Sequence, residues 1–504
     1  MSHYLKKNNH KSKKKAVIIG GGIGGIASAI RAHALGYKTT LIERLSALGG
    51  RAQVFKKNGY IHDAGPTVLT APFLFDELFF LLNTKREEHL EFKALDPWYS
   101  YYFHTGETFN YRANISDTLN EIEHFNPDDK QNYLNLLSAS EKIFNVGFTK
   151  LSSEPFNKLS TMVLQTPNII RLGGYKTVSQ FVNSYLEHPL LQRAFSIHPL
   201  LVGGNPFSTT SIYSLIHFLE RKWGVYFCMG GTGKLISTLH KLMIQNGIEI
   251  ELETDVTNMV VKDSIVESAR TSSGKQFDAD LFISNADPPT LFNEILPTRR
   301  SIFNKIVPET MTTYSMGLFV LFFGTKKRYD DVAHHTIWMG KRFKSLLSDI
   351  FENKKLSQDF SLYIHRPTAT DSSFAPTGCD SFYVLCPVPN LLGKINWQSE
   401  GPKLSKRIID ALDKTIMPEL SKYYDDDFFM TPQDFQSNYR STHGAGFSIA
   451  PSLHQSAWFR YHNYDHSFKN LFLVGAGTHP GAGMPGVLCS AKVVERLIAE
   501  KLPH

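Results

Sequence analysis

The most informative pattern of the chain lies near its start, where residues 15–43 read KAVIIGGGIGGIASAIRAHALGYKTTLIE. Residues 15–19 are a short apolar run rich in β-branched side chains, which is typical of a buried strand. Apolar residues then recur at helical spacing through residues 23–34, and Gly36 ends the predicted helix. Residues 39–42 repeat the strand pattern. A strand, a helix and a second strand in this order favour a parallel sheet.

Glycines fill the turn between the first strand and the helix, and Gly20, Gly22 and Gly25 satisfy the spacing GxGxxG. Glycines allow the backbone to approach a pyrophosphate, which is stabilised by the positive N-terminus of the helix. Glu43 follows about 20 residues later, where an acid accepts the ribose hydroxyls of a dinucleotide and repels a 2′-phosphate. We therefore predict a dinucleotide other than NADP. A glycine-rich turn without a ligand is the alternative, and the surrounding strand, helix and acid disfavour it.

Two further segments favour FAD over NAD as this dinucleotide. Gly49, Gly50 and Arg51 follow the acid closely and offer a second backbone approach and a cation for phosphate. A simple NAD-binding domain does not need this second phosphate-binding segment, whereas a domain that binds the longer FAD does. Residues 63–67 read DAGPT and predict a tight turn that lines the flavin. The cofactor-binding residues predicted in this turn and in a later segment are Gly65, Pro66, Thr67 and Val256.

A glycine-rich loop stands between the last predicted strand, residues 471–474, and a predicted helix over residues 487–497. The loop covers residues 475–486 and reads GAGTHPGAGMPG, with six glycines and two prolines. We expect the N-terminus of the following helix to face the flavin and to stabilise its anionic reduced form. A glycine-rich surface loop is the alternative. The predicted cofactor-binding residues of this loop are Gly475, Gly483 and Met484.

Composition and charge exclude several classes of protein. The 504 residues are 42% hydrophobic and 20% charged, which excludes a disordered chain and allows large cores. The net charge is +7, and residues 6–15 hold six lysines and no acid, so the rest of the chain is close to neutral. Nucleic-acid binders carry a basic face on the folded body, so no nucleic acid is expected as a partner. The tail suits an anionic membrane surface, with a solvated disordered tail as the alternative.

Two motifs are interpreted as structural. Residues 230–234 read GGTGK, but Cys228 replaces the first glycine of a phosphate loop and Leu235 follows its lysine, so they predict a turn that opens a helix. His334 and His335 form a pair on a loop or strand, and no carboxylate partner is identified for them. No metal site is therefore predicted.

The remaining candidates give no catalytic residue. Asp63 and His479 lie near the expected flavin, but each is interpreted as a structural turn residue. No uninterrupted apolar run reaches about 18 residues, so no membrane-spanning helix is expected. The four cysteines have no CxxC or zinc-finger spacing, which indicates free thiols in a reducing compartment. They are Cys228, Cys379, Cys386 and Cys489.

These motifs together resemble the bacterial-type phytoene desaturases, which are carotenoid desaturases of the flavin amine-oxidase superfamily. The resemblance covers nearly the whole chain from about residue 15, while the lysine tail and the segment after Phe156 depart from the family pattern. The C-terminal signature is its most specific part. The matching segments are residues 20–51, 63–67, 196–217, 223–225, 230–233, 284–287, 455–460 and 474–486.

The resemblance implies an α/β protein in which a discontinuous Rossmann-like FAD-binding domain holds an inserted α+β domain for substrate and membrane binding. It also implies FAD as the redox cofactor, phytoene as the substrate and peripheral attachment to a membrane from the cytoplasm. The expected ranges are residues 1–14 for the basic tail, 15–90, 225–290 and 466–504 for the FAD-binding domain, and 91–224 and 291–465 for the inserted region.

The implied reaction is desaturation of a long apolar polyene to a more conjugated carotenoid such as lycopene. A hydride leaves for the flavin and a proton leaves the neighbouring carbon, and a quinone or dioxygen is the expected electron acceptor. The alternatives are a carotenoid cis–trans isomerase that uses reduced FAD, a non-enzymatic prenyl or lipid carrier on the same fold, and an amine oxidase. The number of desaturation steps and the choice of C40 over C30 substrate stay open.

Overall fold

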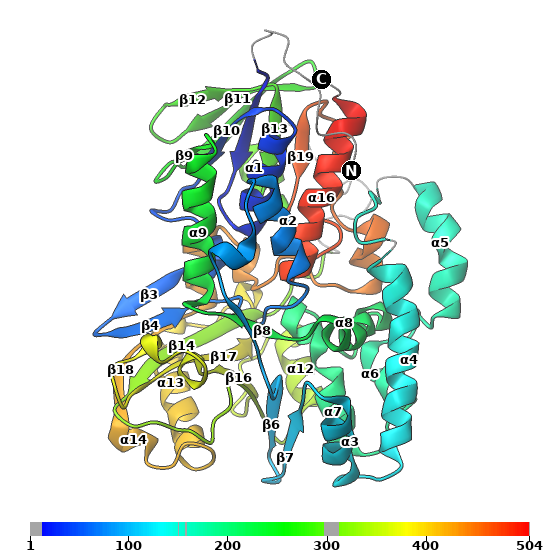
Figure 1. The fold of residues 1–504 in the computed structure, drawn as a ribbon, viewed down its shortest axis with the longest axis vertical. Coiled ribbons are helices and arrows are strands. Elements are labelled where there is room, and N and C mark those ends of the chain that lie inside the picture. Colours follow the sequence, from blue (N-terminus) through cyan, green and yellow to red (C-terminus); the bar gives the residue numbers. More distant parts are fainter. Residues whose placement is uncertain (1–12, 150, 157–158, 297–311, 503–504) are drawn as a thin grey trace.

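The computed structural model describes residues 13–149, 151–156, 159–296 and 312–502. Figure 1 shows a parallel sheet in the upper part of the molecule and a larger mixed sheet in the lower part, with a group of helices beside the latter. Most of the lysine tail lies outside the described residues. Within the described ranges, no helix is long and apolar enough to cross a membrane.

The upper sheet has five strands, all parallel, in the order β19-β13-β1-β2-β9. Ile18 of β1 pairs with Leu41 on one side and with Ile283 on the other. The predicted strand–helix–strand unit and its parallel pairing are confirmed. The strands are β1 (Lys15–Ile19), β2 (Lys38–Ile42), β9 (Glu249–Glu251), β13 (Leu281–Ser284) and β19 (Leu471–Leu473).

The two faces of this sheet are covered by different layers. Ala16 and Ile18 pack into a core with the helices α1 (Ile23–Ala34), α2 (Phe73–Leu81), α9 (Gly231–Gln245) and α16 (Met484–Lys501). Val17 and Ile19 point to the opposite face because side chains alternate along a strand. There they meet an antiparallel sheet of β10 (Val256–Lys262), β11 (Ile265–Thr271) and β12 (Gln276–Asp278).

The lower sheet has seven strands in the order β18-β14-β17-β16-β15-β6-β7, with only β15 and β6 parallel among its pairs. Its strand β14 is buried along its whole length. The strands are β6 (Tyr99–Phe103), β7 (Thr108–Tyr111), β14 (Gly317–Thr325), β15 (His335–Met339), β16 (Leu362–His365), β17 (Asp380–Val388) and β18 (Tyr424–Met430).

Helices complete the lower part. Residues of α13 (Trp397–Asp413) and α14 (Leu420–Tyr423) pack into one core with the sheet, and those of α12 (Lys344–Phe351) and α15 (Pro432–Tyr439) pack into another. The helical group stands at the right of Figure 1, and all of its helices except α5 contribute described side chains to an aromatic core. Its helices are α3 (Ile115–Glu123), α4 (Asp129–Gly147), α5 (Leu159–Arg171), α6 (Val178–Asn183), α7 (Pro189–Ser196) and α8 (Leu215–Trp223).

Two short strand pairs join these parts. The hairpin of β3 (Val54–Lys57) and β4 (Tyr60–Asp63) follows the first βαβ unit, and β5 (Phe92–Ala94) pairs with β8 (Tyr226–Cys228). The second pair links the predicted inserted region to the predicted FAD-binding domain, and we keep the domain limits as a proposal. A single turn, α10 (Pro288–Thr290), follows β13. All four cysteines are free thiols, as predicted.

Candidate functional site

Two cavities meet between the sheets. The first, which we call the sheet-end cavity, has a volume of about 320 Å³ and lies at the carboxyl ends of β1, β2, β13 and β19. Ligands of open parallel sheets bind at this edge. The second, which we call the apolar cavity, has a volume of about 400 Å³. Gly65, Pro66, Gly483 and Met484 line both cavities, so the two are neighbours.

The structure brings twelve of the fourteen predicted cofactor-binding residues together around the sheet-end cavity. Two are placed elsewhere. Gly25 is not in the lining, and a Cβ there would lie 1.9 Å from the carbonyl oxygen of Gly20, so this glycine lets the helix pack on the turn. Thr67 lines the apolar cavity instead. The twelve are Gly20, Gly22, Glu43, Gly49, Gly50, Arg51, Gly65, Pro66, Val256, Gly475, Gly483 and Met484.

Helix α1 begins at this cavity. Gly22, Ile23 and Gly24 line it, and no side chain caps the helix, so its first N–H groups are available to an anion. Glu43, at the end of β2, is only 5% exposed and accepts hydrogen bonds from the N–H groups of Gly21 at 2.7 Å and Leu45 at 2.8 Å. Burial raises the pKa of Glu43, and the backbone hydrogen bonds oppose that rise. The arrangement fits a pyrophosphate at the helix and a ribose at the acid.

Arg51 supplies a partly buried cation in the same lining. Its Nη2 donates to Ser441 Oγ at 2.9 Å, while its Nε has no hydrogen-bond partner among the described residues. Burial lowers the pKa of the guanidinium, and the charge of Asp287 opposes that shift. A partly buried guanidinium with an unused N–H fits a phosphate group.

The glycine-rich loop closes the cavity from the other end of the chain. Gly483 has a φ of +90°, and helix α16 begins at Met484, three residues before the predicted start. The helix starts early because Pro485 suits its first turn. No side chain caps this helix either, and its first residues line both cavities. The sheet-end cavity is lined by the N-termini of both α1 and α16, which fits an extended dinucleotide. Its flavin ring would then lie near the residues that line both cavities.

The apolar cavity contains one acidic side chain in its described lining, Glu220 of α8. Glu220 is 1% exposed and accepts a hydrogen bond from the hydroxyl of Tyr99 at 2.8 Å. The Nε2 of His198 lies 3.1 Å from its other oxygen. Burial, followed by the charge of Glu220, raises the pKa of Tyr99 well above its usual value. Sequence reasoning missed Glu220, because an acid between Leu219 and Arg221 on a helix carries no local signal of burial.

Asp63 and His479 are held by the backbone. Asp63 accepts hydrogen bonds from the N–H groups of Thr232 at 2.9 Å and Gly233 at 3.4 Å, so it caps helix α9. Burial raises the pKa of Asp63 to about 6. His479 lines the apolar cavity, its Nε2 lies 3.4 Å from the carbonyl oxygen of Leu151, and burial lowers its pKa to about 4. The predicted helix-opening turn at residues 230–234 is confirmed, since α9 begins at Gly231.

Comparison with known proteins agrees with this site. The family model described as flavin containing amine oxidoreductase matches residues 23–494. Lycopene-forming phytoene desaturases of Pseudescherichia vulneris and Pantoea ananas are 43% and 42% identical to the chain, over 96% of its length and 99% of theirs. The neurosporene-forming phytoene desaturase of Cereibacter sphaeroides is 36% identical over 95% of this chain and 93% of its own.

Solved structures share the fold at low identity. An oxidoreductase from Methanosarcina mazei has a TM-score of 0.64 and 15% identity, over 96% of this chain and 100% of that one. Wild-type putrescine oxidase bound to putrescine has a TM-score of 0.63 and 11% identity, over 98% of this chain and 100% of that one.

The chain therefore belongs to the flavin containing amine oxidoreductase family, and it is an FAD-dependent oxidoreductase. Within that family it is a member of the bacterial phytoene desaturases, as the resemblance implied.

Proposed function

We propose that this protein desaturates phytoene, with lycopene as the product. The observation that carries the proposal is the apolar cavity of about 400 Å³ beside the FAD-binding lining, in a chain 43% identical to a lycopene-forming phytoene desaturase. A long uncharged polyene offers no group for ion pairing, so its affinity comes from apolar contact. The 43% and 42% identity to lycopene-forming phytoene desaturases, over nearly the whole chain, disfavours the amine oxidase alternative.

The residues of the chain position the polyene and stabilise charge. FAD, when bound, supplies the hydride acceptor. Loss of a hydride from an allylic carbon leaves positive charge on the polyene, and Glu220 is the acidic side chain of the described cavity wall that can stabilise it. Tyr99 and His198 hold the Glu220 carboxyl group in place through their hydrogen bonds. The apolar walls exclude water from the reacting carbons.

The test is expression of the chain in a host that accumulates phytoene, followed by the absorption spectrum and mass of the pigment. Loss of hydrogen with a longer chromophore is expected. An unchanged mass with altered double-bond geometry would instead indicate the isomerase, and an unchanged pigment with a colourless purified protein would indicate the carrier. A quinone or dioxygen is proposed as the electron acceptor, and anaerobic assays with and without added quinone distinguish them.

We further propose that the polyene enters from a membrane surface beside helix α5. Met162 and Ile169 of this helix line the apolar cavity, while Leu164 is 74% and Ile170 is 57% exposed. Tyr175, just beyond the helix, is 67% exposed. An apolar side facing solvent at the wall of an apolar cavity is suited to contact with lipid. The basic tail adds electrostatic attraction to anionic lipid in this proposal.

A further inference from the structure

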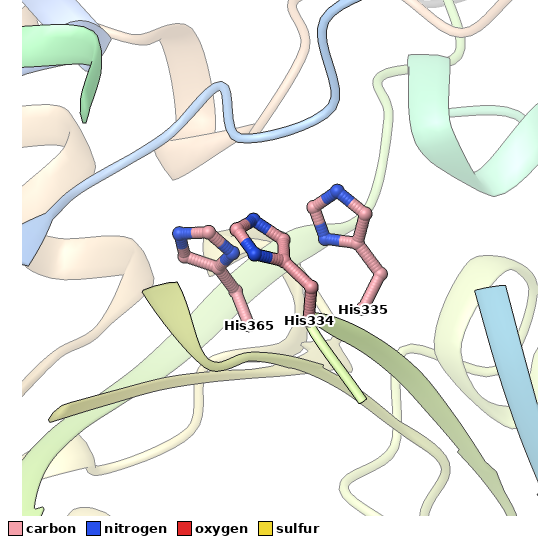
Figure 2. A group of neighbouring side chains, drawn as sticks. All are labelled: His334, His335 and His365. Carbon is pink, nitrogen blue, oxygen red and sulfur yellow. The ribbon is translucent and has the colours of Figure 1, made fainter. Parts of the chain in front are cut away.

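Three histidines meet at one end of strands β15 and β16, although they are distant in the sequence. His335 pairs with His365 across the two strands, so both side chains emerge on the same face. His334 comes just before β15, in a bend, and its carbonyl oxygen accepts a hydrogen bond from the N–H of Arg366. Figure 2 shows the three rings gathered above the sheet, with His334 between the other two.

The distances within this histidine cluster suit a shared ion. The ring centroid of His334 lies 4.6 Å from that of His335 and 4.8 Å from that of His365. The ring centroids of His335 and His365 are 5.4 Å apart. One nitrogen from each ring lies within 4.8 Å of the others. Tetrahedral zinc holds its nitrogens at about 2.0–2.1 Å, which places them about 3.3 Å from each other. Binding of one ion therefore requires the three nitrogens to move closer together than they lie in this structure.

The chemistry of the three rings favours a ligand over a packed core. His334 is 5% exposed, and His335 and His365 are fully buried. The Nε2 atoms of all three, and the Nδ1 of His365, have no hydrogen-bond partner among the described residues. Buried polar atoms almost always have partners, so four unpartnered nitrogens in one cluster need an explanation.

The other ring nitrogens have the partners that metal-binding histidines usually have. The Nδ1 of His334 lies 2.7 Å from Thr370 Oγ1, and the Nδ1 of His335 lies 2.8 Å from the hydroxyl of Tyr363. Such contacts orient the ring and leave the opposite nitrogen for the ion. The cation nearby in sequence, Arg366, has its own counter-charge, since its Nη1 lies 3.3 Å from Asp380 Oδ2.

We propose that His334, His335 and His365 bind a divalent metal ion of the zinc class, with water in the fourth position. Three imidazoles and an open position are a common ligand set for zinc. If His335 binds the metal through Nε2, its ring proton must be on Nδ1. The Nδ1–H group then donates a hydrogen bond to the hydroxyl oxygen of Tyr363. That hydroxyl then donates to Thr67 Oγ1, 2.5 Å away. Tyr363 and Thr67 both line the apolar cavity, so the metal fixes the direction of hydrogen bonds in its wall.

The test measures metal in the FAD-loaded protein, prepared without an affinity tag. Mass spectrometry of the dialysed protein is expected to show one equivalent of zinc or a similar ion, and calorimetry after chelator treatment is expected to show uptake of one Zn²⁺ per chain. Wild-type protein that contains no such ion and takes up no Zn²⁺ would overturn the proposal, whatever the variants do.

Variants assign the ion to these residues. His365→Gln is expected to abolish stoichiometric Zn²⁺ uptake while FAD content, which reports folding, is retained. The matched control is His62→Gln, because His62 is equally buried, with one ring nitrogen 3.0 Å from Ser381 Oγ and the other unpartnered. Tyr363→Phe is expected to weaken Zn²⁺ affinity about 10- to 100-fold without abolishing it. Equal Zn²⁺ uptake by wild type and FAD-loaded His365→Gln would show that the ion binds elsewhere.

Discussion

Three glycines of the first turn, Gly21, Gly22 and Gly25, each lie close to a different part of the protein. A Cβ on Gly25 would lie 1.9 Å from the Gly20 carbonyl oxygen, and one on Gly21 would lie 2.5 Å from Leu48 Cδ2. A Cβ on Gly22 would meet the side-chain amide of Asn285 first, at 2.9 Å, on the wall of the sheet-end cavity. All three positions are too crowded for a Cβ, and Gly22 alone of the three also lines the cavity, so a side chain there would in addition enter the space of the ligand.

Gly22→Val is expected to give folded protein with little or no FAD, because the added methyl groups occupy the space of the pyrophosphate. The measurement is the flavin absorbance per chain after purification. The control is Gly274→Ala, where the new Cβ has nothing within 4 Å and only the φ of +85° costs stability, about 1–2 kcal/mol. Full FAD occupancy in Gly22→Val would exclude a role for this turn in binding the cofactor.

Glu220→Gln removes the negative charge from the wall of the apolar cavity at nearly constant shape. The expected result is a fall in kcat of about 100-fold, the usual effect of losing one charge-stabilising group, with FAD content unchanged. Tyr99→Phe, which removes one hydrogen bond to the carboxyl group, is expected to have a smaller effect. A Glu220→Gln enzyme that retains wild-type kcat would show that the carboxylate does not act on the reacting polyene.

At the scale of elements, helix α5 combines an inner and an outer apolar side. Met162 and Ile169 face the apolar cavity, and Leu164 and Ile170 are exposed. Burial of one such side chain in lipid contributes about 1.5–3 kcal/mol. The double variant Leu164→Asp/Ile170→Asp is therefore expected to bind liposomes at least ~100-fold more weakly.

Liposome sedimentation of the purified protein measures this effect. Ile244→Asp is the matched control, because Ile244 is 56% exposed on α9, on the other side of the molecule in Figure 1. Deletion of residues 1–14 is expected to weaken binding at low salt only, since salt screens the lysine charges. If the α5 double variant and the Ile244 control bind equally well, the membrane contact lies elsewhere.

The glycine-rich loop before α16 depends on one buried side chain. Arg460 is 1% exposed, and it donates to the carbonyl oxygens of Ala476 at 2.6 Å and Thr478 at 3.0 Å. Gly483 of the same loop has a φ of +90°, and a Cβ there would lie 3.1 Å from Val202 Cγ1. A valine at position 483 would therefore strain the backbone of the loop itself. Such a variant could not show whether the loop stabilises the anionic reduced flavin.

Arg460→Ala is expected to lower the free energy of unfolding by at least ~3 kcal/mol, because buried carbonyl groups lose their donors. Urea titration followed by flavin release measures the loss. Arg496→Ala is the control, since the side chain of Arg496 is 49% exposed and such substitutions usually change stability by less than about 0.5 kcal/mol. Equal unfolding midpoints for the two variants would exclude Arg460 as the anchor of the loop.

At the scale of the whole molecule, buried histidines make stability depend on pH. Burial lowers the pKa of His62 and of His479 to about 4. The unfolded chain binds these protons near pH 6.5, whereas the folded chain does not, so acid favours unfolding. Asp63 acts in the opposite sense, because its pKa is raised to about 6 and its protonation stabilises the folded state as pH falls.

His62, His479 and Asp63 together are expected to lower stability by about 3 kcal/mol between pH 6.5 and about 4, and other buried histidines with a lowered pKa, such as His217, add to this loss. Urea unfolding across this range measures it. His62→Gln is expected to flatten the slope, because it removes one group that takes up a proton only on unfolding. A stability that rises steadily over this range would show that Asp63 and other acids dominate.

Much of the cofactor site followed from local patterns. The strand, turn and helix of residues 15–34 form by short-range packing and glycine geometry, and the structure has them at Lys15–Ile19 and Ile23–Ala34. The predicted roles of Gly22, Glu43 and Arg51 rest on spacing along the chain, and the structure gathers them at one cavity. The spacing could not separate Gly25, which packs, from Gly22, which lines the cavity, because that difference depends on what lies opposite each Cα.

What the sequence determined by itself was the class of fold, the dinucleotide turn and the glycine-rich loop, since each depends on neighbours along the chain. Only the tertiary structure decided that Glu220 stands in the wall of the apolar cavity and that Arg460 holds the loop. It also decided that His365 joins His334 and His335, which sequence reasoning treated as an isolated pair. The physical reason is that strand pairing and helix packing bring together residues that are distant in the sequence. The pairing register of β15 with β16 cannot be predicted from the residues next to any one histidine.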